Sequence, residues 1–200
     1  MKNRTRALVS SLLTLAMIIG FMPGASIKAS AAGADNWYKD ANISWYNKDW
    51  SSFTIDTAED LAGLAKLVNE ETDDFKGDTI TLDADIDLTG HEWTPIGWYN
   101  FKDSYIYPFD GTFDGGGHKI EGVNISTDAI KECGLFGCLW TSACIKNLNV
   151  ENVNIASSYY VEDIANPGIA DAGGIVGYSY GGTVENCLAT GTVTVTGAQA

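Results

Sequence analysis

The residues that could carry out chemistry are concentrated in a few short stretches, of which the most glycine-rich is "PFDGTFDGGGH" at residues 108–118. A phosphate-binding loop needs G-x-x-x-x-G-K-[ST], and a dinucleotide-binding loop needs G-x-G-x-x-G before a helix; neither spacing occurs here. An EF-hand places oxygen ligands at positions 1, 3 and 5 of its loop, whereas Asp110 and Asp114 are four residues apart. We therefore predict a tight corner before a strand, with Phe113 pointing inward. A calcium site is the alternative.

A second stretch, "GYSYG" at residues 177–181, fits the G-x-S-x-G turn of serine hydrolases. In those enzymes a helix follows the serine, and the catalytic histidine comes later in the chain. Here a glycine turn and the strand-like "GTVENC" follow Ser179, and both histidines, His91 and His118, precede it. We predict a turn within a repeat and assign no catalytic residue.

Carboxylates alternate with apolar residues in "TITLDADIDL", where Asp83, Asp85 and Asp87 share one side of an expected strand that could bend midway. Alternate residues on a strand lie about 7 Å apart, which is compatible with the paired acids of a glycosidase. Acidic residues on a solvent-facing strand also discourage pairing between molecules. We favour this second role.

Aromatic residues are unusually dense in "GWYNFKDSYIYPFD" at residues 97–110, which holds six of them in fourteen positions. Aromatic rings provide large contact surfaces for sugars and peptide chains. The candidate ligand-binding residues are Trp98, Tyr99, Tyr105 and Tyr107. The alternative, which we favour, is a loop that folds back to cover the protein's own apolar surface.

One helix and many short strands must position these groups. Thr57 can cap a helix over residues 58–70, and a single apolar face is formed by Leu61, Leu64, Ala65 and Val68. After residue 78 the apolar period becomes two, which indicates strands. Residues 32–52 form a polar and aromatic leader or linker.

A repeat links two of the strand-rich runs. "GLFG" at residues 134–137 matches "GIVG" at residues 174–177, and "IKN" at 145–147 matches "VEN" at 184–186, with offsets of 40 and 39 residues. Repeats of this size with glycine turns indicate stacked coils, in which each unit covers the apolar face of the next. Cys187 aligns with Leu148 at an inward position, so we expect it to be buried.

These motifs, "GLFG" with "IKNL" and "GGIVG" with "VENC", resemble the GLUG repeat of large secreted and surface proteins of bacteria, including accessory regions of immunoglobulin A peptidases. The resemblance covers roughly residues 53–197. It implies a mainly β fold, a right-handed parallel β-helix over residues 53–200 with the helix near residue 60 as its N-terminal cap. It implies no catalytic site.

Charge limits the binding partners that we expect, and the cysteine spacings limit the roles of the cysteines. A basic start, a short apolar run and "ASA" at residues 29–31 predict a signal peptide at residues 1–31 and therefore export. The formal net charge of −14 disfavours binding to nucleic acid or an anionic membrane and permits diffuse attraction of Ca²⁺. The cysteine spacings do not match zinc sites, so we expect small buried residues, with one disulfide as the alternative.

Together these observations predict a non-enzymatic module, secreted or on the cell surface, for adhesion or display, with a glycan or a host surface protein as partner. No cofactor and no membrane insertion of the mature chain are expected. One alternative is a β-helix enzyme that degrades polysaccharide, or an accessory segment of one. Another is a carbohydrate-binding module that uses residues 97–110. The final "GTVTVTGAQA" has no polar cap, so we expect a longer, multidomain protein.

Overall fold

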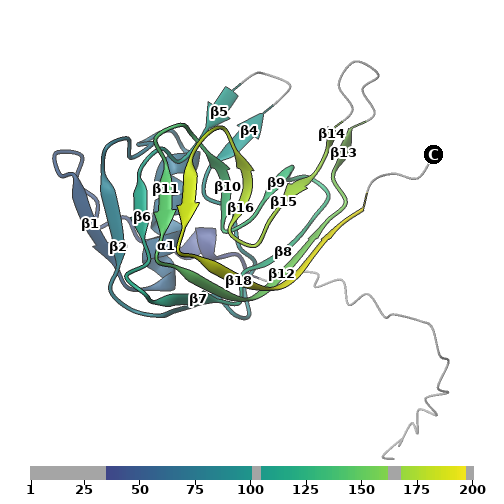
Figure 1. The fold of residues 1–200 in the computed structure, drawn as a ribbon, viewed down its shortest axis with the longest axis horizontal. Coiled ribbons are helices and arrows are strands. Elements are labelled where there is room, and N and C mark those ends of the chain that lie inside the picture. The colour runs from purple at the N-terminus through teal and green to yellow at the C-terminus, as the bar shows by residue number, and fades with distance from the viewer. Residues whose placement is uncertain (1–34, 101–104, 162–167, 197–200) are drawn as a thin grey trace, which may run out of the picture. The chain divides into compact units, whose positions relative to one another are not determined.

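The computed structural model describes residues 35–100, 105–161 and 168–196, which belong to the unit Gly33–Ala200 (Figure 1). The expected signal peptide at residues 1–31 lies outside the described residues. The described part is mainly β, with mostly parallel strands. No helix in these three ranges is long and apolar enough to cross a membrane.

Two helices occur early in the described chain: the 3-10 helix η1 (Trp37–Asp40) and the α-helix α1 (Ala58–Asn69). The strands are, in order, β1 (Ser52–Ile55), β2 (Thr79–Leu82), β3 (Ile86–Asp87), β4 (Trp98–Asn100), β5 (Tyr105–Tyr107), β6 (Thr112–Asp114), β7 (Lys119–Glu121), β8 (Asn124–Thr127), β9 (Glu132–Cys133), β10 (Phe136–Leu139), β11 (Cys144–Lys146), β12 (Asn149–Ser157), β13 (Tyr160–Val161), β14 (Gly168–Ile169), β15 (Asp171–Ala172), β16 (Val176–Ser179), β17 (Thr183–Glu185) and β18 (Leu188–Val195). The expected strand at residues 79–88 is thus broken midway into β2 and β3.

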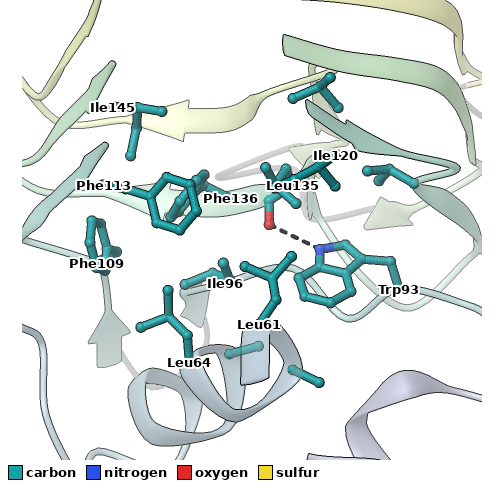
Figure 2. Packing of buried hydrophobic residues seen from close by; sticks show 14 of the residues in the cluster. Leu61, Leu64, Trp93, Ile96, Phe109, Phe113, Ile120, Leu135, Phe136 and Ile145 are labelled. Carbon is teal, nitrogen blue, oxygen red and sulfur yellow. Dashed lines mark hydrogen bonds between the residues drawn. The ribbon is translucent and has the colours of Figure 1, made fainter. Parts of the chain in front are cut away.

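The predicted helix is confirmed. Thr57 caps α1, because its Oγ1 accepts a hydrogen bond from the Asp60 backbone N–H at 3.1 Å. All four residues of the expected apolar face are buried. Figure 2 shows Leu61 and Leu64 pointing from this helix into the same core as Ile96 and Phe113.

The opposite side of α1 is covered by residues from the expected leader. The Asn42 backbone N–H donates to the Glu59 carbonyl at 2.8 Å, and its side chain donates to Asp60 Oδ1 at 2.6 Å. A side chain at Gly63 would collide with the Asn42 carbonyl. Trp45 packs against the core on this side. The chain from residue 35 onward is therefore part of the folded unit.

Parallel pairing assembles the strands into stacked layers. One sheet has the order β1-β2-β6-β11-β17, and a second has the order β3-β7-β12-β18, with β8 also paired to β12 (Figure 1). The pair β10–β16 aligns Phe136 with Val176, and β11–β17 aligns Ile145 with Val184. These are the two repeat offsets seen in the sequence, so the predicted register is confirmed. Among the described strands, β4–β5 and β13–β14 pair antiparallel.

The inward residues of successive layers form one apolar core. Phe113 is fully buried, as expected, and its ring lies 5.3 Å from that of Phe136. Trp93 satisfies its buried Nε1–H by donating to the Leu135 carbonyl at 3.0 Å (Figure 2). Contacts between layers therefore hold together segments that are far apart in sequence.

The corners between the two sheets carry a side-chain ladder. Asn147 and Asn186 occupy equivalent corners with positive φ angles of 54° and 52°, a conformation that asparagine tolerates better than most residues. Asn186 Nδ2 donates to Asn147 Oδ1 at 2.7 Å, and Asn147 Nδ2 donates to Asp114 Oδ1 at 3.0 Å. Each corner is thus hydrogen-bonded to the corner of the adjacent layer.

We expect Asn147→Ala to lower the free energy of unfolding by about 2–3 kcal/mol, because alanine is strained at positive φ and both ladder bonds are lost. Urea denaturation measures this change. Asn152 is the matched control: its φ is also 54°, but its side chain makes no hydrogen bond within the described residues. Asn152→Ala should therefore cost about 1 kcal/mol. Equal losses for both variants would show that the ladder does not contribute.

The burial predicted for Cys187 is wrong, because this side chain is only half-buried. It precedes β18, which pairs with β12 on one side and has no further strand on the other among the described residues. Val184 and Leu188 are likewise 47% and 54% exposed. The alignment of Cys187 with Leu148 is right, but no further layer among the described residues covers the layer that contains Cys187.

Candidate functional site

The glycine-rich and serine-containing stretches form corners and turns, as predicted. Gly116 and Gly117 have positive φ angles of 62° and 85° between β6 and β7. Asp110 is buried and accepts hydrogen bonds from the Lys76 ammonium and the Ser142 N–H. Ser179 ends β16 before a turn into β17. Within the described ranges, no three His, Cys, Asp or Glu side chains lie close enough to hold a metal ion.

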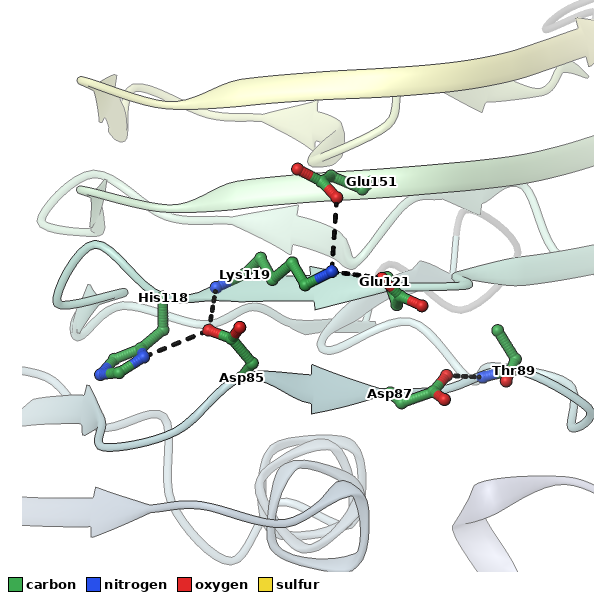
Figure 3. Close-up of polar contacts among 7 residues, drawn as sticks. All are labelled: Asp85, Asp87, Thr89, His118, Lys119, Glu121 and Glu151. Carbon is green, nitrogen blue, oxygen red and sulfur yellow. Dashed lines mark hydrogen bonds and ion pairs between the residues drawn. The ribbon is translucent and has the colours of Figure 1, made fainter.

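The three alternating acids are exposed, and two of them, Asp85 and Asp87, make local structural hydrogen bonds (Figure 3). Asp85 Oδ1 accepts from the Lys119 N–H at 3.1 Å and lies 3.2 Å from His118 Nδ1. The Lys119 backbone N–H is the main cause of the lowered pKa of Asp85. The Thr89 backbone N–H lowers the pKa of Asp87 in the same way. These interactions favour a structural role over the acid–base pair of a glycosidase.

The aromatic stretch forms the hairpin β4–β5, and its four candidate residues divide between two faces. Trp98 pairs with Tyr107 in register, and their rings lie 4.7 Å apart; the Tyr105 ring follows at 6.2 Å. Tyr99 lies on the other face and stacks near Tyr178 at 6.4 Å. Tyr105 is 59% exposed, whereas the other three are half-buried. The hairpin thus covers part of the protein's own surface and leaves aromatic area exposed.

A cleft of about 530 Å³ lies beside this hairpin. Its aromatic lining comes from η1, from β4 and from the segment between β12 and β13, and comprises Tyr38, Trp98, Tyr99 and Tyr159. Asn69, the last residue of α1, fixes one wall: its Nδ2 donates to the Pro95 carbonyl at 3.0 Å, and its Oδ1 accepts from the Gly97 N–H at 2.8 Å. The volume lies within the range of about 300–1,000 Å³ that is usual for small-molecule sites.

The charged part of the cleft is a buried carboxylate. The Glu132 side chain is 2% exposed; its Oε2 accepts from the Tyr99 N–H at 3.3 Å. Its Oε1 makes no hydrogen bond, although the Lys131 ammonium lies 3.6 Å away and itself pairs with Asp171 at 2.7 Å. Burial raises the pKa of the Glu132 carboxyl, and Lys131 only partly opposes this.

A carboxyl whose pKa is raised by folding stabilises the folded state only at acidic pH, below the pKa of the unfolded chain, and this contribution is lost as the pH rises through the raised value. Glu132→Gln cannot ionise. We therefore expect it to raise the melting temperature at about pH 7 and to lose this advantage at about pH 4. Glu151→Gln, which changes a partly exposed carboxylate of β12, is the control. A lower melting temperature than the parent at both pH values would contradict this prediction.

Sequence analysis found the hairpin but missed most of the cleft. Tyr38, Tyr159 and Glu132 come from distant segments with no shared period. A second aromatic pair could have been found: the 40-residue offset aligns Trp140 with Tyr180, and their rings stack at 4.6 Å.

Comparison with known proteins supports the repeat assignment. Residues 170–194, which run from β15 into β18, match the GLUG motif. The chain is 29% identical over 147 residues to halomucin from Haloquadratum walsbyi, an alignment that covers 72% of this chain and 1% of halomucin. The chain thus corresponds to a very small part of that relative. No solved structure matches the chain.

Proposed function

We propose that this chain is a non-enzymatic, extracellular surface module for adhesion or display, built on a right-handed parallel β-helix capped by α1. The observation that carries the proposal is the in-register parallel stacking of β10 on β16 and of β6, β11 and β17, since stacked repeats give extended binding faces. The GLUG motif and the similarity to halomucin support a surface or extracellular location.

Location and binding need separate tests. The full chain with a C-terminal epitope tag should be found on the cell surface or in the medium, and removal of residues 1–31 should keep it inside the cell. The secreted chain, coupled to beads, should then retain them on surfaces coated with glycans or with host surface proteins. Retention of the tagged full chain in the cytoplasm, or beads that adhere to neither coating, would contradict the proposal.

A carbohydrate-binding role through residues 97–110 is the second candidate, and the half-exposed rings of the β4–β5 hairpin favour it. The enzyme alternative predicts release of new reducing ends, or of unsaturated sugars, from polysaccharide. Both products can be measured on the same preparation, and their absence is the result we expect.

A further inference from the structure

The cleft contains one hydrogen-bond acceptor that the protein leaves unused. A buried carboxylate oxygen without a donor is costly, because it has lost water and gained no partner. Glu132 Oε1 has no hydrogen-bond donor, although the Lys131 ammonium lies 3.6 Å away, and its side chain is 2% exposed and belongs to the cleft lining. A group that destabilises the fold in this way is expected where a ligand supplies the missing donor.

The charges around Glu132 limit what that ligand can be. An anion would be repelled by Glu132 itself and by a chain of net charge −14. A cation would meet the Lys131 ammonium, which lies 3.6 Å from the same oxygen. A neutral molecule with hydroxyl donors fits without either repulsion.

The aromatic lining favours a ligand that also has an apolar face. Trp98 and Tyr99 are half-buried residues of β4, and Tyr38 of η1 is a third aromatic residue of the lining. Tyr38 is held in place by its hydroxyl, which donates to Glu70 Oε1 at 3.2 Å. Hydroxyl donors combined with C–H surfaces that cover aromatic rings are the chemistry of a sugar.

We propose that this cleft binds a sugar unit of a neutral glycan: the Glu132 side chain turns toward the cleft so that Oε1 accepts from one sugar hydroxyl, and the apolar sugar face covers Trp98. This inference rests on the adhesive function proposed above and names its ligand class and site. Glu132 and Trp98 act in binding, and no bond is broken.

The test uses the full chain on an array of neutral gluco-, manno- and galacto-oligosaccharides beside acidic ones, followed by calorimetric titration with the neutral oligosaccharide that binds best. Glu132→Gln replaces Oε1 or Oε2 with an amide N–H₂, so we expect about tenfold weaker binding or more. Trp98→Ala should weaken binding about tenfold by removing ring area. Glu151→Gln and Tyr180→Ala, which change a carboxylate and an exposed ring outside the cleft, should bind as the parent does.

The outcomes separate this site from the general function. Neutral oligosaccharide binding that survives both Glu132→Gln and Trp98→Ala would overturn the site and leave glycan adhesion standing. A parent chain that binds only acidic glycans, or no glycan, would overturn the inference, while adhesion to host proteins is judged by the bead assay. If circular dichroism shows that Glu132→Gln does not fold, the affinity of Trp98→Ala compared with that of Tyr180→Ala decides whether the cleft is the binding site.

Discussion

Leu64→Asp is expected to leave the chain without a stable fold. Leu64 is fully buried and faces the core in which Phe109 and Phe113 lie (Figure 2). An aspartate there would place a carboxylate among apolar side chains, which costs several kcal/mol even after it takes up a proton. That loss is comparable to the whole stability of a typical domain, about 5–15 kcal/mol.

Because of the position of α1, its loss would also affect the neighbouring strands. In Figure 3 the helix lies beyond β3, the strand that carries Asp87, on the side away from β7 and Lys119. Without the helix, the core residues against which it packs would be exposed, and exposed apolar surface favours association between molecules.

Size-exclusion chromatography, thermal melting and limited proteolysis measure the result for Leu64→Asp. We expect aggregation, or rapid cleavage within residues 53–90. Lys66→Asp, on the same helix but half-buried, is the control and should cost about 1 kcal/mol or less. A Leu64→Asp chain that stays monomeric and melts with the parent would show that α1 does not stabilise the first layers.

The second large loss is expected for Gly137→Ala. A Cβ at Gly137 would collide with the Gly97 carbonyl and come within 3.0 Å of Pro95 Cβ and 3.1 Å of the Glu132 carbonyl. Backbone atoms supply two of these contacts and cannot move aside. We therefore expect a loss of about 3 kcal/mol or more in the free energy of unfolding.

Gly117→Ala is the comparison for this effect. Gly117 has a positive φ of 85°, but a Cβ there meets nothing within 4 Å. Alanine should cost only about 1–2 kcal/mol from backbone strain. Urea denaturation of both variants decides: equal losses would mean that close backbone approach is not what requires glycine in "GLFG". Gly177, the stacked equivalent in the GLUG motif, is similarly confined, with the Cys133 N at 2.8 Å from its Cβ position.

The sequence predicted those parts of the fold that depend on local period or repetition. The cap at Thr57 and the face around Leu61 follow from helical spacing. The register of β10 on β16 follows from the 40-residue repeat. Both signals come from residues close together in sequence, or from two copies of one pattern.

The cleft could not be predicted because its contacts join residues that are neither close together in sequence nor part of a repeated pattern. Glu132 meets Tyr99 across 33 residues, and Asn69 fixes Gly97 across 28. In "IKECGLFG" Glu132 has no alternating neighbours that mark it as buried. The prediction that Cys187 is buried was wrong for another reason: alignment gives a residue's place within its layer, but not whether a further layer covers it.

The way the β4–β5 hairpin leaves the stack has a consequence for how such proteins diversify. Ile96 and Phe109, which flank the hairpin, form bridges to Phe136 and Leu139, so both of its ends are held on the single strand β10. Residues inserted, deleted or exchanged between these two anchors need not shift the corners at Asn147 and Asn186. New surface chemistry can therefore be recruited at this point by loop exchange, while the stacked parallel strands evolve under the constraint of the layer spacing, about 4.8 Å.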